Sequence, residues 1–413
     1  MFYYTYQDKI CFSQKKYVDL PRIDESQASH TEGLLYALLE LHPQQSRRSF
    51  CLSTPGLLEL QKEGLNLLQK QRETGPVLPS WLLEKINNRK VMALNRFYPD
   101  WDNAFSMNPL HKWRVHIAGL GDVGGTLLMG LRLMGGSCID SIGIFDRSQE
   151  KLLRWQYEIN QIYGPSDTPF PSVDIIAEED VFNCDLFVFC IAAKVPAVGE
   201  EGKDVRMVQL EENAKILSIY GKQARASGYK GLFAVVSDPV DLLCKSLLLS
   251  SNQDEKGIYD FKGLAPEQIR GYGLGVMHAR ALYYANQQED TIHYEKEGRA
   301  FGPHGADLVI ADSIENYHES RSLLLTEKAK TANLEVRKVG FKPFIAPALS
   351  SGALSLIATI KGNWHYSATY MGGVYMGARN RYHPSGTEIE MLELPQRLLE
   401  RLQHTYTRLE NLL

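Results

Sequence analysis

Residues 114–146 read RVHIAGLGDVGGTLLMGLRLMGGSCIDSIGIFD, and this stretch decides the fold. A short apolar run at 115–118 predicts a buried strand, and the glycines after it have the spacing G-x-G-x-x-G. Helical apolar spacing from 126 to 134 and a second apolar run at 139–145 predict a helix and a second strand. Strand, glycine turn, helix and strand follow one another as in a dinucleotide-binding unit.

The glycines and the acid of this stretch have separate tasks in such a unit. The first glycine permits the tight turn, the second lets the backbone approach a pyrophosphate, and the third lets helix and strand pack closely. Asp146 follows Gly124 by 22 residues, near the spacing expected for an acid that binds ribose hydroxyls. That acid favours NAD over NADP because it would repel a 2′-phosphate, although Arg147 beside it leaves an opening for NADP. The candidate cofactor-binding residues are Gly119, Gly121, Asp122, Val123, Gly124, Asp146, Arg147 and Ala192.

Composition narrows the class of protein. The chain has 413 residues, of which 44% are hydrophobic and 23% charged, as in ordinary globular proteins. A net charge of −4 favours neither nucleic acid nor an anionic membrane as a partner. The six cysteines form no C-x-x-C pair and no metal-ligand spacing, so we expect free thiols and no metal site. With no signal-peptide pattern and no apolar run of transmembrane length, the predicted location is the cytoplasm.

The order of strand-like and helix-like segments predicts an α/β protein in three parts. Residues 1–112 are expected to form a mostly helical N-terminal extension. Residues 113–262 alternate strands and helices, which predicts a Rossmann-type, doubly wound parallel sheet that binds NAD. Residues 263–413 are expected to form an α+β substrate domain that ends in antiparallel strands and an amphipathic helix.

The N-terminal extension is the part whose pattern is weakest. Residues 2–6 and 10–13 are expected to pair as a hairpin. Apolar spacing predicts helices at 32–41 and 57–71, and the segment from Pro79 looks like another helix start. We therefore expect a small helical cap or an oligomer contact.

Three further motifs follow the glycine turn in order. They are Val235-Val-Ser-Asp-Pro-Val-Asp241 at a strand end, Gly271-Tyr-Gly273 leading to His278-Ala-Arg280, and Gly302-Pro-His-Gly305. With the closing strands from Gly373, they make the chain from about residue 114 onward resemble the lactate/malate dehydrogenase family. The resemblance implies an NAD-dependent oxidoreductase that transfers hydride between nicotinamide and a small 2-hydroxy or 2-oxo acid. It also implies a homo-oligomer, either a dimer or a tetramer.

The resemblance assigns roles that suit the chemistry of these side chains. Arg280 would hold the substrate carboxylate, because a guanidinium makes two parallel charge-assisted hydrogen bonds with it. His304 would be the acid/base, since histidine titrates near neutral pH. Arg206 would contact the substrate and stabilise charge in the transition state. As alternatives, Arg280 and Arg206 are ordinary helix arginines and His304 is structural.

Two positions depart from the family pattern. Met277 stands where the family has an aspartate that orients the histidine, and Asp307 is a candidate substitute. Asp238 stands where the family has an asparagine, and its carboxylate accepts hydrogen bonds only. Asp238, the third candidate catalytic residue, is therefore either protonated by burial, paired with His304 or Arg206, or facing a cationic group of the substrate.

These departures leave several functions open. An amino- or imino-acid substrate would explain the added charge at Asp238, and Ile345 favours a non-acidic side chain. A catalytically weakened NAD-binding protein with a regulatory or structural role is the main alternative. The related NAD- and metal-dependent glycosidases are a third reading, although Met277 replaces their cysteine ligand.

Overall fold

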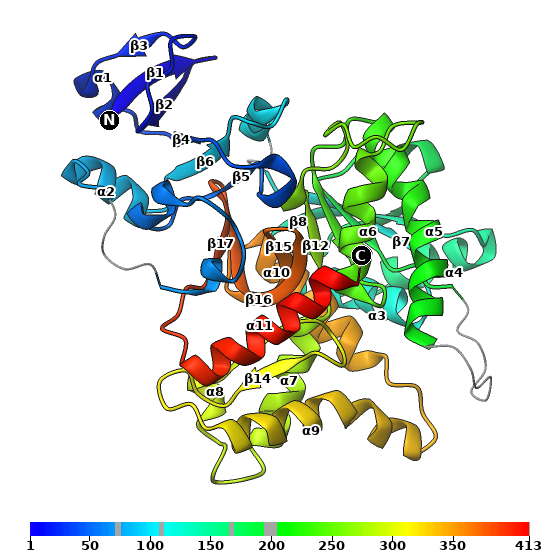
Figure 1. The fold of residues 1–413 in the computed structure, drawn as a ribbon. Coiled ribbons are helices and arrows are strands. Elements are labelled where there is room, and N and C mark those ends of the chain that lie inside the picture. The colour runs from blue at the N-terminus through cyan, green and yellow to red at the C-terminus, as the bar shows by residue number, and fades with distance from the viewer. Residues whose placement is uncertain (71–75, 107–110, 165–168, 194–204, 413) are drawn as a thin grey trace.

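The described residues form two large β-sheets and a lobe of helices that includes a small two-stranded sheet. The computed structural model describes residues 1–70, 76–106, 111–164, 169–193 and 205–412, with the backbone alone for 106 and 205–208. Figure 1 shows the first sheet in blue at the upper left, the larger sheet through the centre and the lobe, coloured lime to gold, below.

The larger sheet has nine strands in the order β17-β16-β15-β12-β11-β10-β7-β8-β9. Strands β7 to β12 are parallel, and β15, β16 and β17 continue the sheet antiparallel. The chain runs outward from β7 to one edge and returns beside it, which is the doubly wound order and confirms the predicted Rossmann-type fold. The strands are β7 (Trp113–Ala118), β8 (Ile139–Phe145), β9 (Ser172–Ile175), β10 (Leu186–Phe189), β11 (Leu232–Val235), β12 (Ile269–Gly271), β15 (His365–Met371), β16 (Val374–His383) and β17 (Gly386–Ile389).

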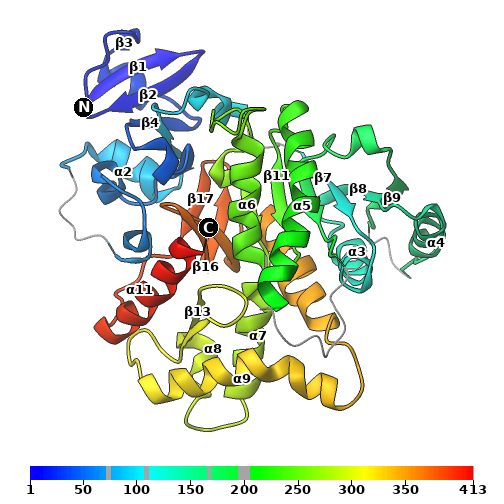
Figure 2. The same cartoon turned by 45° about the vertical axis from the view of Figure 1, so that its right-hand side comes forward.

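Both faces of this sheet are covered by helices, and β10 shows why. Its four residues are all buried, because alternate side chains point to opposite faces of a sheet. Leu186 and Val188 join a core with α3 and α4, whereas Phe187 and Phe189 join a second core with α5 and α6 (Figure 2). The continuous apolar run therefore reports a strand buried on two sides. The helices are α3 (Asp122–Met134), α4 (Gln149–Asn160), α5 (Val205–Ala226) and α6 (Val240–Asn252).

The second half of the chain adds the lobe and the closing strands. A β13–β14 hairpin lies beside β16, and the π-helical segment 347–353 packs against α3. The parallel and antiparallel strands form one continuous sheet through the β12–β15 pairing, and the division at 112 and 262 stays a prediction. The remaining elements are α7 (Leu274–Ala285), α8 (Tyr294–Glu297), β13 (Arg299–Phe301), β14 (Val309–Ala311), α9 (Glu319–Lys338), α10 (Leu354–Ile360) and α11 (Gln396–Asn411).

The expectation of a mostly helical N-terminal extension is wrong. These residues build a six-stranded mixed sheet in the order β3-β1-β2-β4-β6-β5, with only two α-helices described, α1 (Glu25–Ser29) and α2 (Ser80–Asn87). The predicted hairpin is confirmed as β1 (Phe2–Tyr6) and β2 (Lys9–Ser13). The other strands are β3 (Arg22–Ile23), β4 (Leu35–Leu39), β5 (Ser49–Cys51) and β6 (Val91–Asn95).

The error has a physical cause in β4. Four of its five residues are buried, because β2 and β6 flank it and both of its faces are covered. A short apolar run of this kind has no alternation and resembles one face of a helix. The second predicted helix is two short 3₁₀ turns, Pro55–Glu59 and Leu65–Leu68, separated around Gly64.

The N-terminal sheet shares its core and its buried charges with the rest of the chain. Side chains of β2 and α2 belong to the same apolar cluster as those of β16 and α11. Glu267, which lies just before β12, accepts hydrogen bonds from the backbone and Nε of Arg48 and from the Ser49 hydroxyl. Asp100 also pairs with Arg48. Arg48 and Glu267 are both almost fully buried, so water solvates neither charge. Each side chain therefore compensates the charge of the other.

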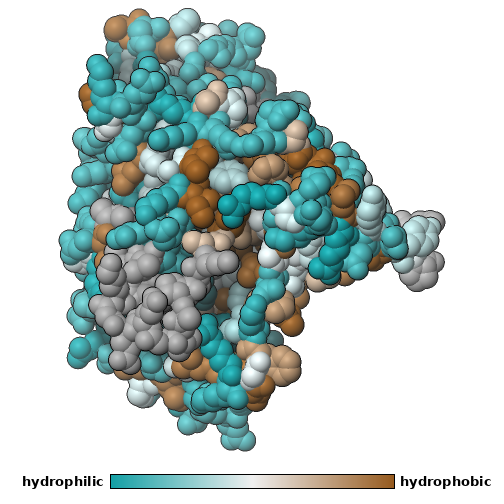
Figure 3. All heavy atoms as spheres, turned by 90° about the vertical axis from the view of Figure 1, so that its right-hand side faces the viewer, coloured by the Kyte–Doolittle hydropathy of each residue, from teal (hydrophilic) through white to brown (hydrophobic). Residues whose placement is uncertain are grey.

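One face of the molecule can be judged by the hydropathy of its side chains. Figure 3 shows that the side to the right in Figure 1 is mostly hydrophilic, with apolar side chains in small groups. Within the described residues, no helix is both long enough and apolar enough to cross a bilayer.

We expect Arg48→Met to destabilise the protein strongly, since it leaves Glu267 buried and charged. The free energy of unfolding should fall by about 3–5 kcal/mol, the usual cost of breaking a buried pair. Urea unfolding followed by circular dichroism measures this change. Lys215→Met is the control, because the Lys215–Glu212 pair is exposed and should contribute under about 1 kcal/mol. Equal losses in the two variants would contradict the assigned role of Glu267.

Candidate active site

The glycine turn between β7 and α3 has the shape that a bound dinucleotide requires. Gly119 has a φ of +93°, which favours glycine, and a Cβ at Gly124 would lie 1.9 Å from the Gly119 carbonyl oxygen. A Cβ at Gly121 would meet nothing within 4 Å. The backbone at Gly121 is therefore open in front of the N-terminus of α3, where amide groups favour an anion. The turn fits a pyrophosphate.

Asp146 lies at the end of β8 beside this turn. It accepts hydrogen bonds from the backbone N–H of Leu120 at 2.8 Å and of Ser148 at 3.1 Å, and it pairs with Lys151 at 3.0 Å. Burial alone would raise the pKa of Asp146, but these donors outweigh it and lower the pKa. The acid is therefore ionised and fixed next to the turn.

The other predicted cofactor residues lie around the same edge of the sheet. Arg147 and Ala192 are exposed and Val123 is half-buried. Asp122 is the first residue of α3, and its carboxylate pairs with Lys342, which follows α9, at 3.1 Å.

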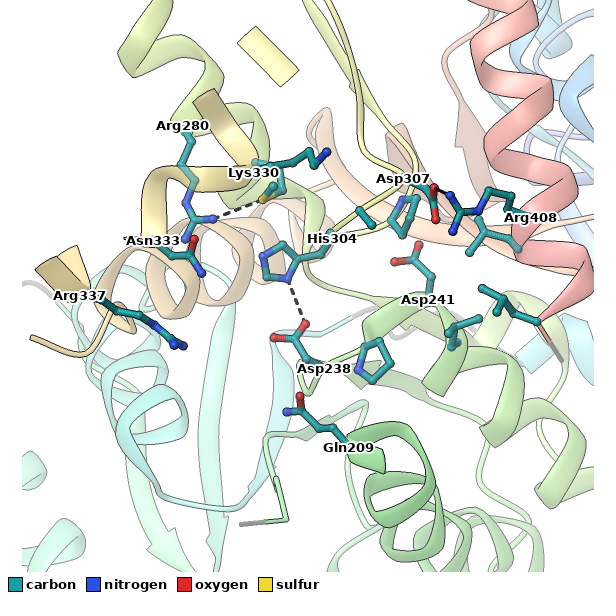
Figure 4. Close-up of a pocket in the computed structure, with 18 residues that line it drawn as sticks. Gln209, Asp238, Asp241, Arg280, His304, Asp307, Lys330, Asn333, Arg337 and Arg408 are labelled. Atoms are coloured by element: carbon teal, nitrogen blue, oxygen red, sulfur yellow. Dashed lines mark hydrogen bonds and ion pairs between the residues drawn. The ribbon is translucent and has the colours of Figure 1, made fainter. Parts of the chain in front are cut away.

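Two loops bring Asp238 and His304 together. Asp238 follows β11, and His304 follows β13, yet Asp238 Oδ1 lies 3.0 Å from His304 Nδ1 (Figure 4). The absence of a side chain at Gly273 permits this approach, since a Cβ there would lie 2.8 Å from the Cβ of His304. The His304 side chain is 20% exposed and that of Asp238 is 50% exposed. Pairing with His304 is therefore observed, whereas the alternative of pairing with Arg206 involves a side chain outside the described residues.

Arg280 enters the same cavity from α7. Its only hydrogen bond within the described residues goes from Nη1 to the sulfur of Met277 at 3.5 Å. Burial lowers the pKa of Arg280 and the charge of Asp238 opposes that shift. A guanidinium nevertheless stays protonated in proteins, so Arg280 presents a cation to the cavity.

The other predicted site residues have different outcomes. Met277 is buried and contacts Arg280. Asp307 does not substitute for the missing acid, because it pairs with Arg408 of α11 at 2.9 Å. Ile345 is exposed and is not among the residues that line the cavity. Arg206 belongs to α5, but its side chain lies outside the described residues.

The cavity also contains side chains that the sequence did not indicate. It measures about 390 Å³ and is lined by Asp238, Arg280 and His304 together with Gln209 of α5 and Asp241 of α6. Lys330, Asn333 and Arg337 line it from α9. Their spacing of three and four residues places them on one helix face, a signal that is visible only once α9 is known to border the site.

Asp241 is the most unusual of these residues. It is 4% exposed, and its Oδ1 has no hydrogen-bond partner among the described residues. Burial, and to a smaller extent the charge of Asp238, raise the pKa of Asp241, whereas a hydrogen bond from the His304 backbone opposes the shift, and the net result is a pKa of about 7. Asp241 therefore supports the backbone of the histidine loop while close to neutral.

Taken together, the arrangement can bind an anion and move a proton. The Asp238 carboxylate occupies Nδ1 of His304, and the described residues place no hydrogen-bond partner on Nε2. An imidazole held in this way can exchange a proton through Nε2, while Arg280 binds a carboxylate beside it.

Comparisons with known proteins agree with this geometry. No family model matches the sequence. The chain is 26% identical over 194 residues to L-lactate dehydrogenase 2 of Staphylococcus aureus, which is 46% of this chain and 54% of that protein. The chain thus spans about half the length of the curated relatives it matches.

Solved structures share the fold over a larger part of the chain. MGS-M5, a lactate dehydrogenase from a Medee basin deep-sea metagenome library, superposes with a TM-score of 0.59 at 19% identity, covering 73% of this chain and 98% of that one. Malate dehydrogenase from Picrophilus torridus gives a TM-score of 0.56 at 17% identity over 72% and 95% of the two chains. This chain therefore has the fold of the lactate and malate dehydrogenases, and the resemblance seen in its sequence is confirmed. It is also longer than these neighbours, which leave about a quarter of it uncovered.

We expect Asp241→Asn to change how stability depends on pH. The native state holds a proton on Asp241 up to about pH 7, whereas the unfolded chain releases it near pH 4. The stability that Asp241 confers is therefore greatest below about pH 4 and falls as the pH rises to about 7. The amide of the variant stays neutral throughout, so the melting temperature should match the natural protein at pH 4 and exceed it at pH 8. Differential scanning calorimetry at both values, with exposed Asp140→Asn as control, measures the difference. A constant difference between Asp241→Asn and the natural protein at both pH values would contradict the assignment.

Proposed function

We propose that this protein is an NAD-dependent oxidoreductase that interconverts a small 2-hydroxy acid and its 2-oxo acid. The observation that carries the proposal is the 3.0 Å hydrogen bond between Asp238 and His304, next to the guanidinium of Arg280. One group binds the substrate carboxylate, and the other exchanges the proton of the substrate hydroxyl.

The protein's own residues would act as follows. Arg280 holds the carboxylate through two charge-assisted hydrogen bonds and so orients the carbon that reacts. In the oxidation direction, His304 Nε2 accepts the hydroxyl proton as the carbonyl forms, and in reduction it returns that proton. Asp238 keeps the Nδ1 proton in place and stabilises the imidazolium. Arg206 is proposed to polarise the carbonyl oxygen.

The nucleotide half would hold the cofactor. Gly119, Gly121, Asp122, Val123 and Gly124 would surround the pyrophosphate at the start of α3, with Asp146 and Arg147 at the ribose and Ala192 at the end of β10. When bound, the nicotinamide supplies the acceptor or donor of the hydride. The open space in front of Gly121 and the ionised Asp146 support NAD.

The position of Asp238 also links the two departures from the family pattern. Met277 removes a carboxylate from α7, and Asp238 adds one at the end of β11. Both positions border one cavity. Compared with the family pattern, the carboxylate that pairs with the histidine would thus have moved from α7 to the end of β11. Because His304 still has a carboxylate partner, this arrangement supports an active enzyme over a weakened NAD-binding protein.

The hydrogen bond between Asp238 and His304 also bears on the class of substrate. Asp238 already accepts a hydrogen bond from His304. Its negative charge therefore does not require a cationic group on the substrate, which favours a hydroxy acid over an amino- or imino-acid. A regulatory NAD-binding protein stays the alternative, supported by the asparagine that is missing at 238. The cytoplasmic location and the homo-oligomeric state are proposed from sequence and resemblance.

A screen of 2-oxo acids with NADH, with and without ammonium, tests the function. We expect NADH oxidation with at least one 2-oxo acid and no dependence on ammonium. Absorbance at the NADH band measures turnover, and fluorescence titration measures NADH binding. Tight NADH binding without turnover across the panel would favour the regulatory alternative, and turnover that requires ammonium would favour an amino acid.

Asp238→Asn tests the proposed acid/base pair. The amide cannot stabilise the imidazolium, so kcat should fall by about 10²–10⁴-fold, and the pKa seen in the pH profile of kcat/KM should fall as well. Affinity for NADH should not change. Asp185→Asn is a matched control, because Asp185 pairs with His111 at 3.2 Å just before β10, at the opposite edge of the sheet. Unchanged turnover in Asp238→Asn would exclude this role for the pair.

A further inference from the structure

A second cavity lies where the N-terminal sheet meets the end of β16. It measures about 610 Å³, within the range of cavities that bind small molecules. Its walls are residues 32–34 before β4, residues 87–90 between α2 and β6, and Arg381, His383 and Pro384. None of these residues lines the cavity around His304. Figure 1 shows β17 next to β5, where the two large sheets meet.

A buried carboxylate fixes the cationic side chains of this second cavity. Glu388 of β17 accepts hydrogen bonds from Arg89 Nη2 and Arg381 Nε, both at 2.8 Å. His383 Nε2 lies 2.9 Å from the same carboxylate. Burial alone would raise the pKa of Glu388, but these three partners lower it to about 2, so the carboxylate is ionised. The Ser385 hydroxyl also donates to the Arg89 carbonyl oxygen at 2.7 Å, and the walls are thus joined before any ligand binds.

The backbone of Arg89 is strained. Helix α2 ends at Asn87, and Arg89 follows with a φ of +55°, the left-handed region that a helix end usually fills with glycine. Strained positions of this kind are concentrated at sites that bind ligands. The guanidinium of Arg89 is the cation that the N-terminal sheet places against Glu388, so the arginine side chain is needed at this position.

The cations of the second cavity outnumber its carboxylates. Arg89, Lys90 and Arg381 are positive, whereas only Glu388 and the exposed Glu32 are negative among the described residues there. The Lys90 ammonium is exposed and has no partner within the described part of the chain. Arg381 uses Nε for Glu388, and its Nη1 and Nη2 make no hydrogen bond with a described residue. The cavity therefore has donors and positive charge available for an anion.

We propose that the second cavity binds a small phosphorylated molecule, whose phosphate group is held by Lys90 and Arg381. A phosphate monoester has close to two negative charges and three strong acceptor oxygens, so it can use a guanidinium and an ammonium together. The side-chain amides of Asn87 and Asn88, which also line the cavity, can donate to hydroxyl groups beside the phosphate. The site is separate from the proposed active site, and the inference does not depend on the proposed function.

Three variants distinguish ligand binding from structural support. Lys90→Gln removes a cation without breaking a side-chain contact among the described residues, so it should fold normally. Arg381→Gln removes the free donors but also one partner of the buried carboxylate. Arg379→Gln is the control, because Arg379 lies on the same strand, stacks on the same Trp364 ring as Arg381 and pairs with Glu390 at 2.6 Å. Arg379 does not line the second cavity.

Calorimetric titration with ribose 5-phosphate and ribose, which differ only by the phosphate group, tests the proposal. At low ionic strength we expect ribose 5-phosphate to bind and ribose not to bind. Lys90→Gln should raise Kd by about tenfold, as the loss of one charge-assisted hydrogen bond predicts. Arg381→Gln should raise Kd at least as much, and Arg379→Gln should leave it within about twofold. Glu32→Gln should lower Kd, because it removes a carboxylate that repels the phosphate.

Inorganic phosphate provides a second measurement. Since the site joins the N-terminal sheet to β16, phosphate should raise the melting temperature more than sodium chloride does at equal ionic strength, and this difference should shrink in Lys90→Gln. If neither ribose 5-phosphate nor phosphate binds, the inference is wrong. Binding that is unchanged in Lys90→Gln would also overturn it, because the phosphate would then bind elsewhere, for example at the glycine turn.

Discussion

The hydrogen bond between Asp238 and His304 joins two parts of the chain whose separate folding would leave no site. Asp238 belongs to the end of a parallel strand, and His304 to a loop of the lobe, 66 residues later. Their contact depends on the missing side chain of Gly273 and on Asp241, which supports the histidine loop from α6. His304, the proposed acid/base, is therefore held by packing from three directions, and such a fixed orientation is what proton transfer requires.

The same edge of the sheet gathers the residues that we propose to bind the cofactor and the substrate. Strands β7, β8 and β11 are parallel, so their carboxyl ends place the glycine turn, Asp146 and Asp238 on one side. Arg280 and Arg337 face this edge from α7 and α9. The fold thus separates the parallel strands, where hydrogen bonds fix Asp146, from a lobe that contributes cations. The pair Asp122–Lys342 spans the two.

The N-terminal sheet is part of this body and not an appendage. Its apolar side chains pack with those of β16 and α11, and the buried Arg48–Glu267 pair ties it to the strand that precedes α7. Because a buried charge without its partner is costly, the N-terminal sheet and the nine-stranded sheet are coupled in stability. The sheet consequently supports the strands that close the larger sheet, although it lines no part of the cavity around His304.

The sequence by itself determined the Rossmann-type part of the fold and singled out His304, Arg280 and Asp146 as candidates, because local spacing dictates glycine turns, strands and helix faces. It misjudged β4, since a short run buried on both faces carries no period. Only the tertiary structure decided which carboxylate serves His304: Asp238 contacts it, while Asp307, much nearer in sequence, pairs with Arg408. Likewise, Asn333 and Arg337 entered the site only when α9 was placed beside α7. Side-chain partners over such separations depend on where loops and helices pack, which no local pattern encodes.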